Sequence, residues 1–462
     1  MDSAYALTVP LAFAGCFPMV AILFMVLPAR RAVIASFLLA WLFLPVASFH
    51  LTGIPDVTKV SVTSISVLLA VTLFDFGRLW AFRPRWFDLA MLIFCLSPFP
   101  SALSNGTGWY DGMSLSLNQV FQWGIPYFLG RVYLTEPAGF RDLAIGVFIG
   151  GLIYVPLCLF EIRMSPQLHR LVYGYHPHSF AQQFRMGGFR PMVFMRHGLQ
   201  VALWMSTASL AGFGLWRLGR MKTFFGFPMP LLVGALCVTL VLCKTVGALA
   251  LFIVGVVALT LLQYARSYLP LYALALIPVA YMGLRGSGLW DGYAMVGMAK
   301  PIIGSARAES LEVRLKNENM LAAKARRQPI FGWGGWGASR VYDDQGRDVT
   351  LSDGQWIIFF GMLGLTGLVS FYTVVLGAAL KVKGRIDPRL RFHPGMAPVV
   401  VIAVCVLLWC INHMPNNSQD PAFMLMIGGL AGLKNVIPAV TVARRVKGSG
   451  VPSRATRVSR RG

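Results

Sequence analysis

Charged residues are scarce in this sequence, and acidic residues are the scarcest of them. Only 13% of the 462 residues are Asp, Glu, Lys or Arg, whereas 56% are hydrophobic. In soluble globular domains about a quarter of the residues are charged. The composition therefore excludes an ordinary soluble domain and predicts an all-α polytopic membrane protein.

The shortage of acidic residues leaves a strong positive balance. Lys and Arg number 41 against 18 Asp and Glu, which gives a formal net charge of +23. Such a charge could indicate nucleic-acid binding, but here the basic residues cluster between apolar segments, as the positive-inside rule requires of membrane proteins. We therefore expect membrane lipids, and not nucleic acid, as partners.

Cysteine motifs are also missing. The seven cysteines form no CxxC pair and no Cys/His spacing typical of a zinc site. We expect no disulfide framework, no metal site and no cofactor. The residues before the first apolar run include no basic residue, which argues against a cleaved signal peptide.

Long apolar segments dominate the rest of the chain. About 20 apolar residues are needed to cross the hydrocarbon core of a bilayer. The short connections at 51–57, 105–112 and 412–419 contain no Lys or Arg, so we expect them and the amino terminus outside, and the carboxyl terminus inside. We predict thirteen transmembrane helices, at residues 8–27, 32–49, 58–75, 87–104, 113–134, 141–161, 191–215, 227–244, 246–264, 268–284, 355–380, 397–413 and 420–438.

Two predicted outer loops are rich in basic residues. The first is the arginine-rich loop 162–196, and the second is the long loop 285–354, in which residues 310–327 form an amphipathic helix pattern. Each could be merely a solvated surface, because long loops are translocated regardless of their charge. We divide the chain into 1–284 with ten spans, 285–354, 355–440 with three spans, and the basic cytoplasmic tail 441–462, which is expected to contact anionic lipids.

Three arginines cluster in the first outer loop. Arg185 and Arg190 lie just before a predicted helix start at Pro191, and Arg196 falls in the second turn of that helix. Free backbone N–H groups and guanidinium groups together suit a phosphate-type anion. Lys244 is expected at the same outer level, although a snorkelling lysine is the alternative.

The second loop contains glycine and tryptophan motifs. Residues 329–337 include a GxGxxG pattern, but no strand precedes it, so it does not indicate a dinucleotide site. Its glycines, with Trp333 and Trp336, predict a turn at the membrane interface. The glycines at 361, 364 and 367 predict close helix packing.

Asp353 has two possible roles. In the pattern Ser-Asp-Gly-Gln at 352–355, Ser352 would be the cap of the next helix in a capping box, and Asp353 would only support that helix start. Alternatively, the carboxylate lies at the outer mouth of the helix bundle and accepts a proton from a hydroxyl group. His197 is another possible base, and His169, His176 and His178 are further alternatives.

Three features occur together between residues 180 and 380. They are the arginine-rich outer loop, the long outer loop with its Pro-x-x-Gly-x-Gly sequence, and a polar residue before a span that contains Gly-Leu-x-Gly-Leu at 364–368. In these features the chain resembles the bacterial O-antigen ligase and polysaccharide polymerase family, whose members are similar in fold to C-type glycosyltransferases. The resemblance implies metal-independent glycosyl transfer from a polyprenyl-diphosphate-linked glycan, on the periplasmic side of the inner membrane.

The resemblance also implies roles for individual residues. Arg185, Arg190, Arg196, Lys244 and Arg340 would bind the diphosphate, and Asp353, Arg190 and Arg196 would take part in catalysis. Ligases of this family typically have a histidine where this chain has Asp353, which favours a polymerase. A glycan ligase and a flippase or other transporter are the alternatives, although a transporter needs ionisable residues inside its spans and none lies at a predicted midpoint. A chain-length regulator and a flippase are the implied partners.

Overall fold

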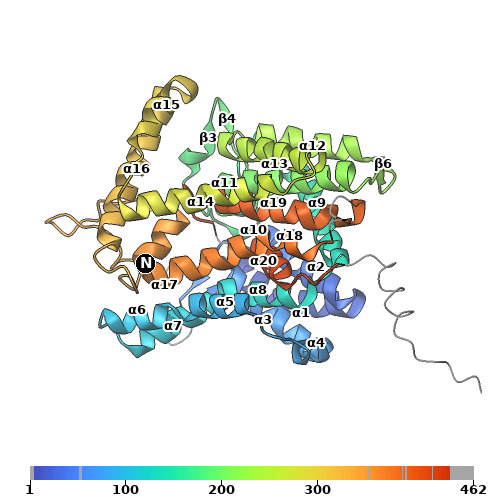
Figure 1. The fold of residues 1–462 in the computed structure, drawn as a ribbon, viewed down its shortest axis with the longest axis horizontal. Coiled ribbons are helices and arrows are strands. Elements are labelled where there is room, and N and C mark those ends of the chain that lie inside the picture. The colour runs from blue at the N-terminus through green and yellow to red at the C-terminus, as the bar shows by residue number, and fades with distance from the viewer. Residues whose placement is uncertain are drawn as a thin grey trace, which may run out of the picture.

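A computed structural model describes residues 5–50, 55–351, 353–387, 389–390, 393–418 and 420–436. The protein is 71% helical, which confirms the predicted all-α class. The only sheets in these ranges are three two-stranded antiparallel hairpins. Most of the long helices run along the longest dimension of the molecule (Figure 1).

The first third of the chain forms one side of the bundle. It consists of α1 (Thr8–Val26), α2 (Ala29–Phe43), the hairpin β1 (Ser48–Phe49) and β2 (Val57–Thr58), α3 (Lys59–Phe74), α4 (Phe76–Trp80), α5 (Trp86–Leu96), α6 (Pro98–Ser104), α7 (Trp109–Gln119), the π-helical turn η1 (Val120–Gly124) and α8 (Ile125–Tyr133).

The middle of the chain contains the longest helix and two of the hairpins. Its elements are α9 (Pro137–Met164), α10 (Leu168–Tyr173), η2 (Phe180–Gln183), β3 (Phe184–Arg185), β4 (Gly188–Phe189), α11 (Gly198–Phe213), η3 (Gly214–Leu218), β5 (Thr223–Phe224), β6 (Phe227–Pro228), α12 (Met229–Leu242), α13 (Val246–Tyr264) and α14 (Leu269–Ser287). The last part has α15 (Tyr293–Ile303), α16 (Ser305–Ala325), α17 (Gln355–Leu380), α18 (Val382–Arg385), η4 (Pro394–Met396), α19 (Ala397–Asn412) and α20 (Pro421–Gly432).

Eight helical segments of the described chain are long and apolar enough to cross a membrane, so the molecule has the architecture of a multi-pass membrane protein. They are 8–26, 86–104, 137–164, 198–218, 246–264, 269–287, 355–380 and 394–412. The thirteen predicted spans are not confirmed. The apolar helices α3, α12 and α20 have 16, 14 and 12 residues, and at 1.5 Å per residue they are shorter than the ~30 Å hydrocarbon core.

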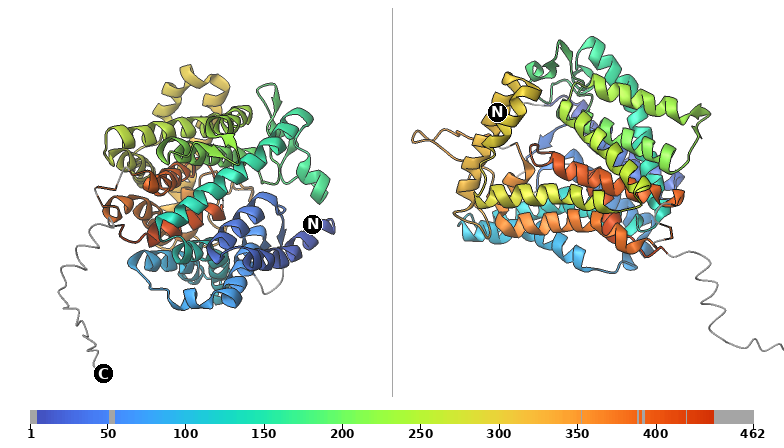
Figure 2. Two further views of the ribbon diagram at one scale, coloured as in Figure 1. Left: turned by 90° about the vertical axis from the view of Figure 1, so that its right-hand side faces the viewer. Right: turned by 45° about the horizontal axis from the view of Figure 1, so that its top comes forward.

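The two ends of the bundle differ in structure. Helices α15 and α16 and residues 326–351 lie at one end, here called the loop end (Figures 1 and 2). Tyr5 packs against Phe49 and Tyr175, so the first described residues lie beside the arginine-rich loop. At the opposite end Lys434 pairs with Glu136 at 2.8 Å. The relative placement of these segments agrees with the predicted topology, whereas the orientation in a membrane stays a prediction.

Charged residues in the predicted spans are paired near helix ends. Arg131 binds Asp88 at 2.7 Å, and the hydroxyl of Tyr127 also donates to Asp88. The hydroxyl of Tyr133 donates to Asp75 at 2.9 Å. These contacts give Asp75, Asp88 and Arg131 pairing partners inside the bundle.

Helix α17 is broken at Gly364, whose φ of 62° and ψ of −160° are not helical. This conformation favours glycine, and it frees backbone groups that an unbroken helix would use. The freed groups pair with the glycine-rich segment 329–334, since Trp333 N–H donates to Gly361 O at 2.8 Å and Leu365 N–H donates to Pro329 O at 2.7 Å. Gly364 therefore lies at a kink against which segment 329–334 packs. It is not part of a regular helical stripe of glycines.

Candidate functional site

The arginine-rich loop is folded around one buried carboxylate. Glu161, near the end of α9, is 1% exposed. Its Oε2 atom accepts hydrogen bonds from the N–H groups of Met192 and Val193, each at 2.7 Å, and its Oε1 atom accepts from Leu168 N–H at 2.8 Å. Three backbone donors satisfy the charge of this carboxylate and fix the course of the loop before Arg196.

A buried lysine holds the same segment from another helix. Lys59, at the start of α3, donates through Nζ to Phe194 O at 3.3 Å and to Trp41 O at 3.1 Å, and it lies 4.4 Å from the Trp41 ring centroid. Residues 192–194 are thus held between a buried acid and a buried amine. These contacts also stabilise Val193 in its unfavourable conformation, with φ of +52°.

The structure corrects the predicted helix start at Pro191. Helix α11 begins at Gly198, and its cap is His197, because the N–H groups of Met192 and Val193 are bound by Glu161 instead of opening a helix. Arg196 therefore precedes the helix and is exposed to solvent. Its N–H donates to Gln200 Oε1 at 3.0 Å.

Lys244 lies against the β3–β4 hairpin that contains Arg185. Its Nζ atom donates to Met186 O at 3.3 Å. A Cβ atom added to Gly188 would lie 2.1 Å from Lys244 Nζ, so the absence of a side chain at Gly188 allows the amine to approach. The tertiary structure brings Lys244 beside Arg185, as expected from their shared outer level.

Arg190 is the most unusual of the clustered cations. It is 7% exposed, and its Nε atom is buried without a hydrogen-bond partner. Within the described chain no carboxylate forms an ion pair with it, and burial, followed by the nearby Arg185, lowers the pKa of its guanidinium group. A buried charge without a counter-ion is costly. The arrangement is suited to binding an anion that the chain itself does not supply.

The neutral ring of His197 can donate a hydrogen bond to a ligand, but it has no nitrogen free to accept one. Its Nδ1 atom accepts from Leu199 N–H at 3.0 Å, so the proton of the neutral ring is on Nε2. Burial, followed by His178 and Arg190, lowers the pKa of His197 to about 3. The ring is neutral at physiological pH and has no free acceptor nitrogen, which disfavours its predicted role as a base.

His169 is used to hold the loop together. Val46 N–H donates to its Nε2 atom at 3.2 Å, and its Nδ1 atom lies 2.9 Å from Tyr175 O. Burial, as the largest cause, lowers the pKa of His169 to about 4. With both ring nitrogens bonded to the backbone, His169 has no nitrogen left for a substrate.

Asp353 lies on the facing long loop and pairs with Arg314 of α16. Arg314 Nε is 3.3 Å from Asp353 Oδ2, and the two side chains are 44% and 48% exposed. The pair joins α16 to the residues just before α17. Sequence reasoning missed Arg314, whose only signal was its place on the amphipathic pattern.

The predicted support of the start of α17 by Asp353 is not seen. The cap position of α17 is Gly354, and no side chain of the described residues caps this helix. Its first N–H group, that of Gln355, donates instead to His413 O at 2.9 Å. The predicted cap, Ser352, lies outside the described residues. Because a backbone carbonyl of the α19–α20 connection fills the capping role, the carboxylate of Asp353 is left at the surface.

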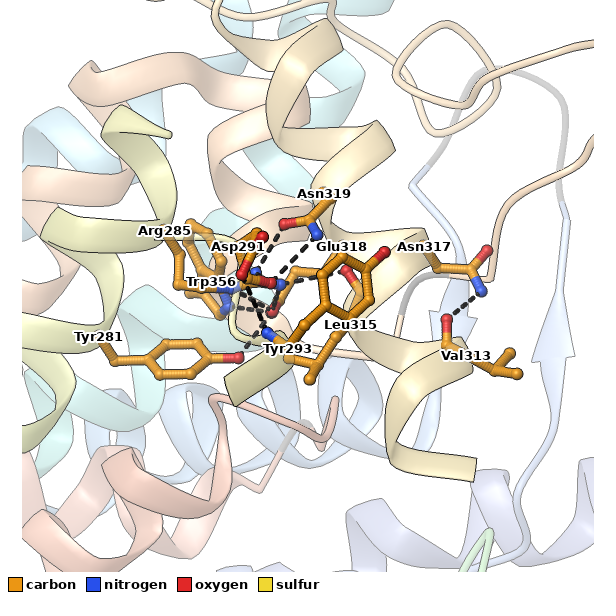
Figure 3. Close-up of polar contacts among 10 residues, drawn as sticks. All are labelled: Tyr281, Arg285, Asp291, Tyr293, Val313, Leu315, Asn317, Glu318, Asn319 and Trp356. Atoms are coloured by element: carbon orange, nitrogen blue, oxygen red, sulfur yellow. Dashed lines mark hydrogen bonds and ion pairs between the residues drawn. The ribbon is translucent and has the colours of Figure 1, made fainter. Parts of the chain in front are cut away.

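Behind Asp353, buried polar contacts attach α16 to the bundle (Figure 3). Glu318 Oε2 lies 2.5 Å from Arg285 Nη2 and accepts from the Tyr281 hydroxyl at 2.6 Å, while Glu318 Oε1 accepts from Trp356 Nε1 at 2.6 Å. Arg285 also donates to the side chain of Asn319 at 2.6 Å and to the backbone carbonyl of Asp291. These contacts join α14, α16 and α17, and so position Arg314 on α16.

Arg340 is placed away from the predicted diphosphate cluster. Its Nε atom donates to Asp348 at 2.7 Å, its Nη2 atom donates to Thr350 O, and its guanidinium group lies 5.2 Å from the Trp336 ring centroid. These contacts stabilise the turn of residues 340–350. The geometry therefore indicates a structural role for Arg340 within the long loop.

The fold defines a helical protein of multi-pass membrane type. Its cationic cluster consists of Arg190 with the nearby Arg185, and of Lys244 packed on the hairpin that contains Arg185. Within the described ranges, no group of three or more His, Cys, Asp or Glu side chains could hold a metal ion. Comparison of the sequence with models of known families and with curated proteins gives no match.

Gly198→Ala is expected to weaken anion binding by displacing Arg190. The added Cβ would lie 2.1 Å from Arg190 Cδ and 2.5 Å from its Cγ. We expect at least a tenfold loss of affinity for inorganic pyrophosphate in titration calorimetry. Gly247→Ala in α13 is the control, because nothing lies within 4 Å of its added Cβ, and it should raise stability by about 0.5–1 kcal/mol. Unchanged affinity in Gly198→Ala would contradict this placement of Arg190.

Proposed function

We propose that this protein joins polyprenyl-diphosphate-linked oligosaccharide repeats into a surface polysaccharide in the bacterial inner membrane. The observation that carries the proposal is Arg190, a buried cation near Arg185 with no acidic partner in the described chain. Lys244 contacts the hairpin that contains Arg185. A diphosphate would supply the missing negative charge. The multi-pass helical architecture supports a donor whose lipid portion remains in the bilayer.

The chemistry follows from where charge develops during glycosyl transfer. A sugar hydroxyl attacks the anomeric carbon, the bond from that carbon to the diphosphate oxygen breaks, and negative charge grows on the departing lipid diphosphate. The cations Arg185, Arg190 and Lys244 are suited to stabilising that charge. Asp353, half-exposed beside Arg314, is suited to accepting the proton of the attacking hydroxyl.

A glycan ligase uses the same donor chemistry with a different acceptor, so it is the second candidate. Deletion of the gene distinguishes the two. A polymerase mutant should accumulate lipid-linked glycan of one repeat, whereas a ligase mutant should accumulate full-length lipid-linked polymer. A deletion strain that makes polymer of normal length and transfers it normally to its acceptor would contradict both candidates. Loss of all lipid-linked glycan from the outer face of the membrane would indicate a transporter.

Asp353→Asn is expected to reduce polymer formation by roughly 100-fold or more in the complemented deletion strain, if this carboxylate is the general base. Asparagine keeps the size of the side chain but neither accepts the proton nor pairs with Arg314. Asp353 does not cap α17, so folding should be unaffected. Asp344→Asn, an exposed change in the same loop, is the control. Near-normal polymer from Asp353→Asn at wild-type protein level would remove it from catalysis.

The membrane orientation is open to a labelling test. We propose a periplasmic amino terminus and loop end and a cytoplasmic carboxyl terminus. Ser310→Cys, on an exposed part of α16, should react with an impermeant thiol reagent in intact spheroplasts. Gly384→Cys, at the opposite end, has no atom within 4 Å of its added Cβ and should react only after permeabilisation. The reverse pattern would invert the proposed orientation.

A further inference from the structure

A cavity with a partly polar lining lies at the loop end, beside the start of α17. Its volume is about 180 Å³, and it is enclosed by the α6–α7 helices, η1, the glycine-rich segment and the first turns of α17. No charged side chain lines it. Its polar lining consists of five side-chain amides, from Asn118, Gln119, Gln122, Gln355 and Asn417.

Two of these amides are buried without the hydrogen bonds they need. Gln355 is 2% exposed, and its Oε1 atom has no partner, nor has the Nε2 atom of Gln119. Buried amide atoms are almost always hydrogen-bonded, and an unsatisfied one costs about 1–3 kcal/mol. The walls of the cavity therefore contain one amide donor and one amide acceptor that no residue of the described chain satisfies.

Two of the other amides are hydrogen-bonded to each other. Gln122 Nε2 donates to Asn118 Oδ1 at 2.8 Å, which leaves the Asn118 NH₂ group and the Gln122 carbonyl available to a ligand. Trp336, which is 49% exposed, supplies aromatic surface to the lining, and the cavity reaches the surface there. Since one water occupies about 30 Å³ in the liquid, the cavity is much larger than a site for a single water.

We propose that this cavity binds one neutral sugar unit of the acceptor glycan. Sugar hydroxyl groups both donate and accept, which matches the amide lining, and the C–H groups of a pyranose ring match the exposed part of Trp336. No cationic side chain lines this cavity, so it is not suited to a diphosphate. The sugar would bind in the cavity, and the diphosphate would bind to the cationic cluster. The inference rests on the proposed function, and Gln355 is only two residues from Asp353, near which the acceptor hydroxyl must lie.

The test uses full-length purified protein and two separate ligands. The first is free oligosaccharide released by mild acid from the lipid-linked glycan of the deletion strain, and the second is inorganic pyrophosphate. Titration calorimetry on wild type, Gln355→Met and Gln119→Met measures both affinities. Methionine preserves side-chain length but cannot form these hydrogen bonds. We expect each variant to bind oligosaccharide about fivefold more weakly, with pyrophosphate affinity unchanged.

The thermal midpoint is the second readout. Replacing an orphan amide by an apolar side chain should leave stability unchanged or raise it, so weaker binding cannot be attributed to unfolding. Gln345→Met changes an exposed amide outside the cavity and should bind like wild type. Oligosaccharide affinity that is absent in wild type, or equal in wild type and both cavity variants, overturns the proposal. The deletion phenotype and the pyrophosphate titration test the proposed function independently of this result.

Discussion

Arg190→Ala is expected to abolish detectable polymer and to weaken pyrophosphate binding by roughly 30-fold or more. One charge-assisted hydrogen bond contributes about 2 kcal/mol, and this factor corresponds to the loss of one such bond. Arg190 is buried without a counter-ion in the described chain. Its removal should therefore leave the free energy of unfolding unchanged or increase it, in contrast to most buried substitutions.

Two further variants make this prediction specific. Arg190→Lys keeps the charge but loses the planar fork of donors, so its affinity should lie between those of wild type and Arg190→Ala. Arg163→Ala removes an exposed arginine at the end of α9 and should behave like wild type. Calorimetry with pyrophosphate and polymer analysis in the complemented deletion strain provide the measurements. Wild-type polymer from a stable Arg190→Ala protein would separate the cationic cluster from the activity.

Glu318→Ala is expected to have the largest effect on the stability of the loop end. It leaves Arg285, whose side chain is 1% exposed, without its carboxylate partner, and removing one partner of a buried pair costs about 3–5 kcal/mol. The Tyr281 hydroxyl and Trp356 Nε1 lose their acceptor as well. We expect α16 to detach locally, with an open population roughly 100-fold or more above that of wild type.

Hydrogen exchange of α16 and its rate of trypsin cleavage would measure this opening. Glu312→Ala removes an exposed glutamate from the same helix and should leave both rates unchanged. The double variant Arg285→Met, Glu318→Leu replaces the pair by apolar side chains and should recover much of the lost stability. Slow exchange of α16 in Glu318→Ala would show that the helix is held mainly by apolar packing.

The sequence predicted the helical class and the separation of the molecule into two unlike ends, but not the number of spans. Apolar composition identifies a segment as helical core without fixing how long the helix runs. Segment 113–134 shows the difficulty. It is helical from α7 through a π-helical turn to α8 without a break, except at its last residue, yet it is not among the eight segments that are long and apolar enough to cross a membrane. The predicted capping and helix-start patterns failed at Asp353 and Pro191 for a related reason. In each case the backbone N–H group at the predicted helix start donates to a residue far away in the sequence. Gln355 N–H donates to His413 O, and Met192 N–H donates to Glu161.

The sequence by itself determined which residue types meet at the candidate site. The basic loop 162–196 singled out Arg185, Arg190 and Arg196, and Lys244 was expected at the same outer level. Only the tertiary structure decided which cations cluster and which do not. Arg190 is buried against Gly198, whereas Arg340 is bound to Asp348. The partner of each guanidinium group depends on how the chain folds around it, and neither charge nor spacing in the sequence predicts that partner. Arg314 and the amide cavity depend on contacts between distant segments alone, so neither had a sequence motif to reveal it.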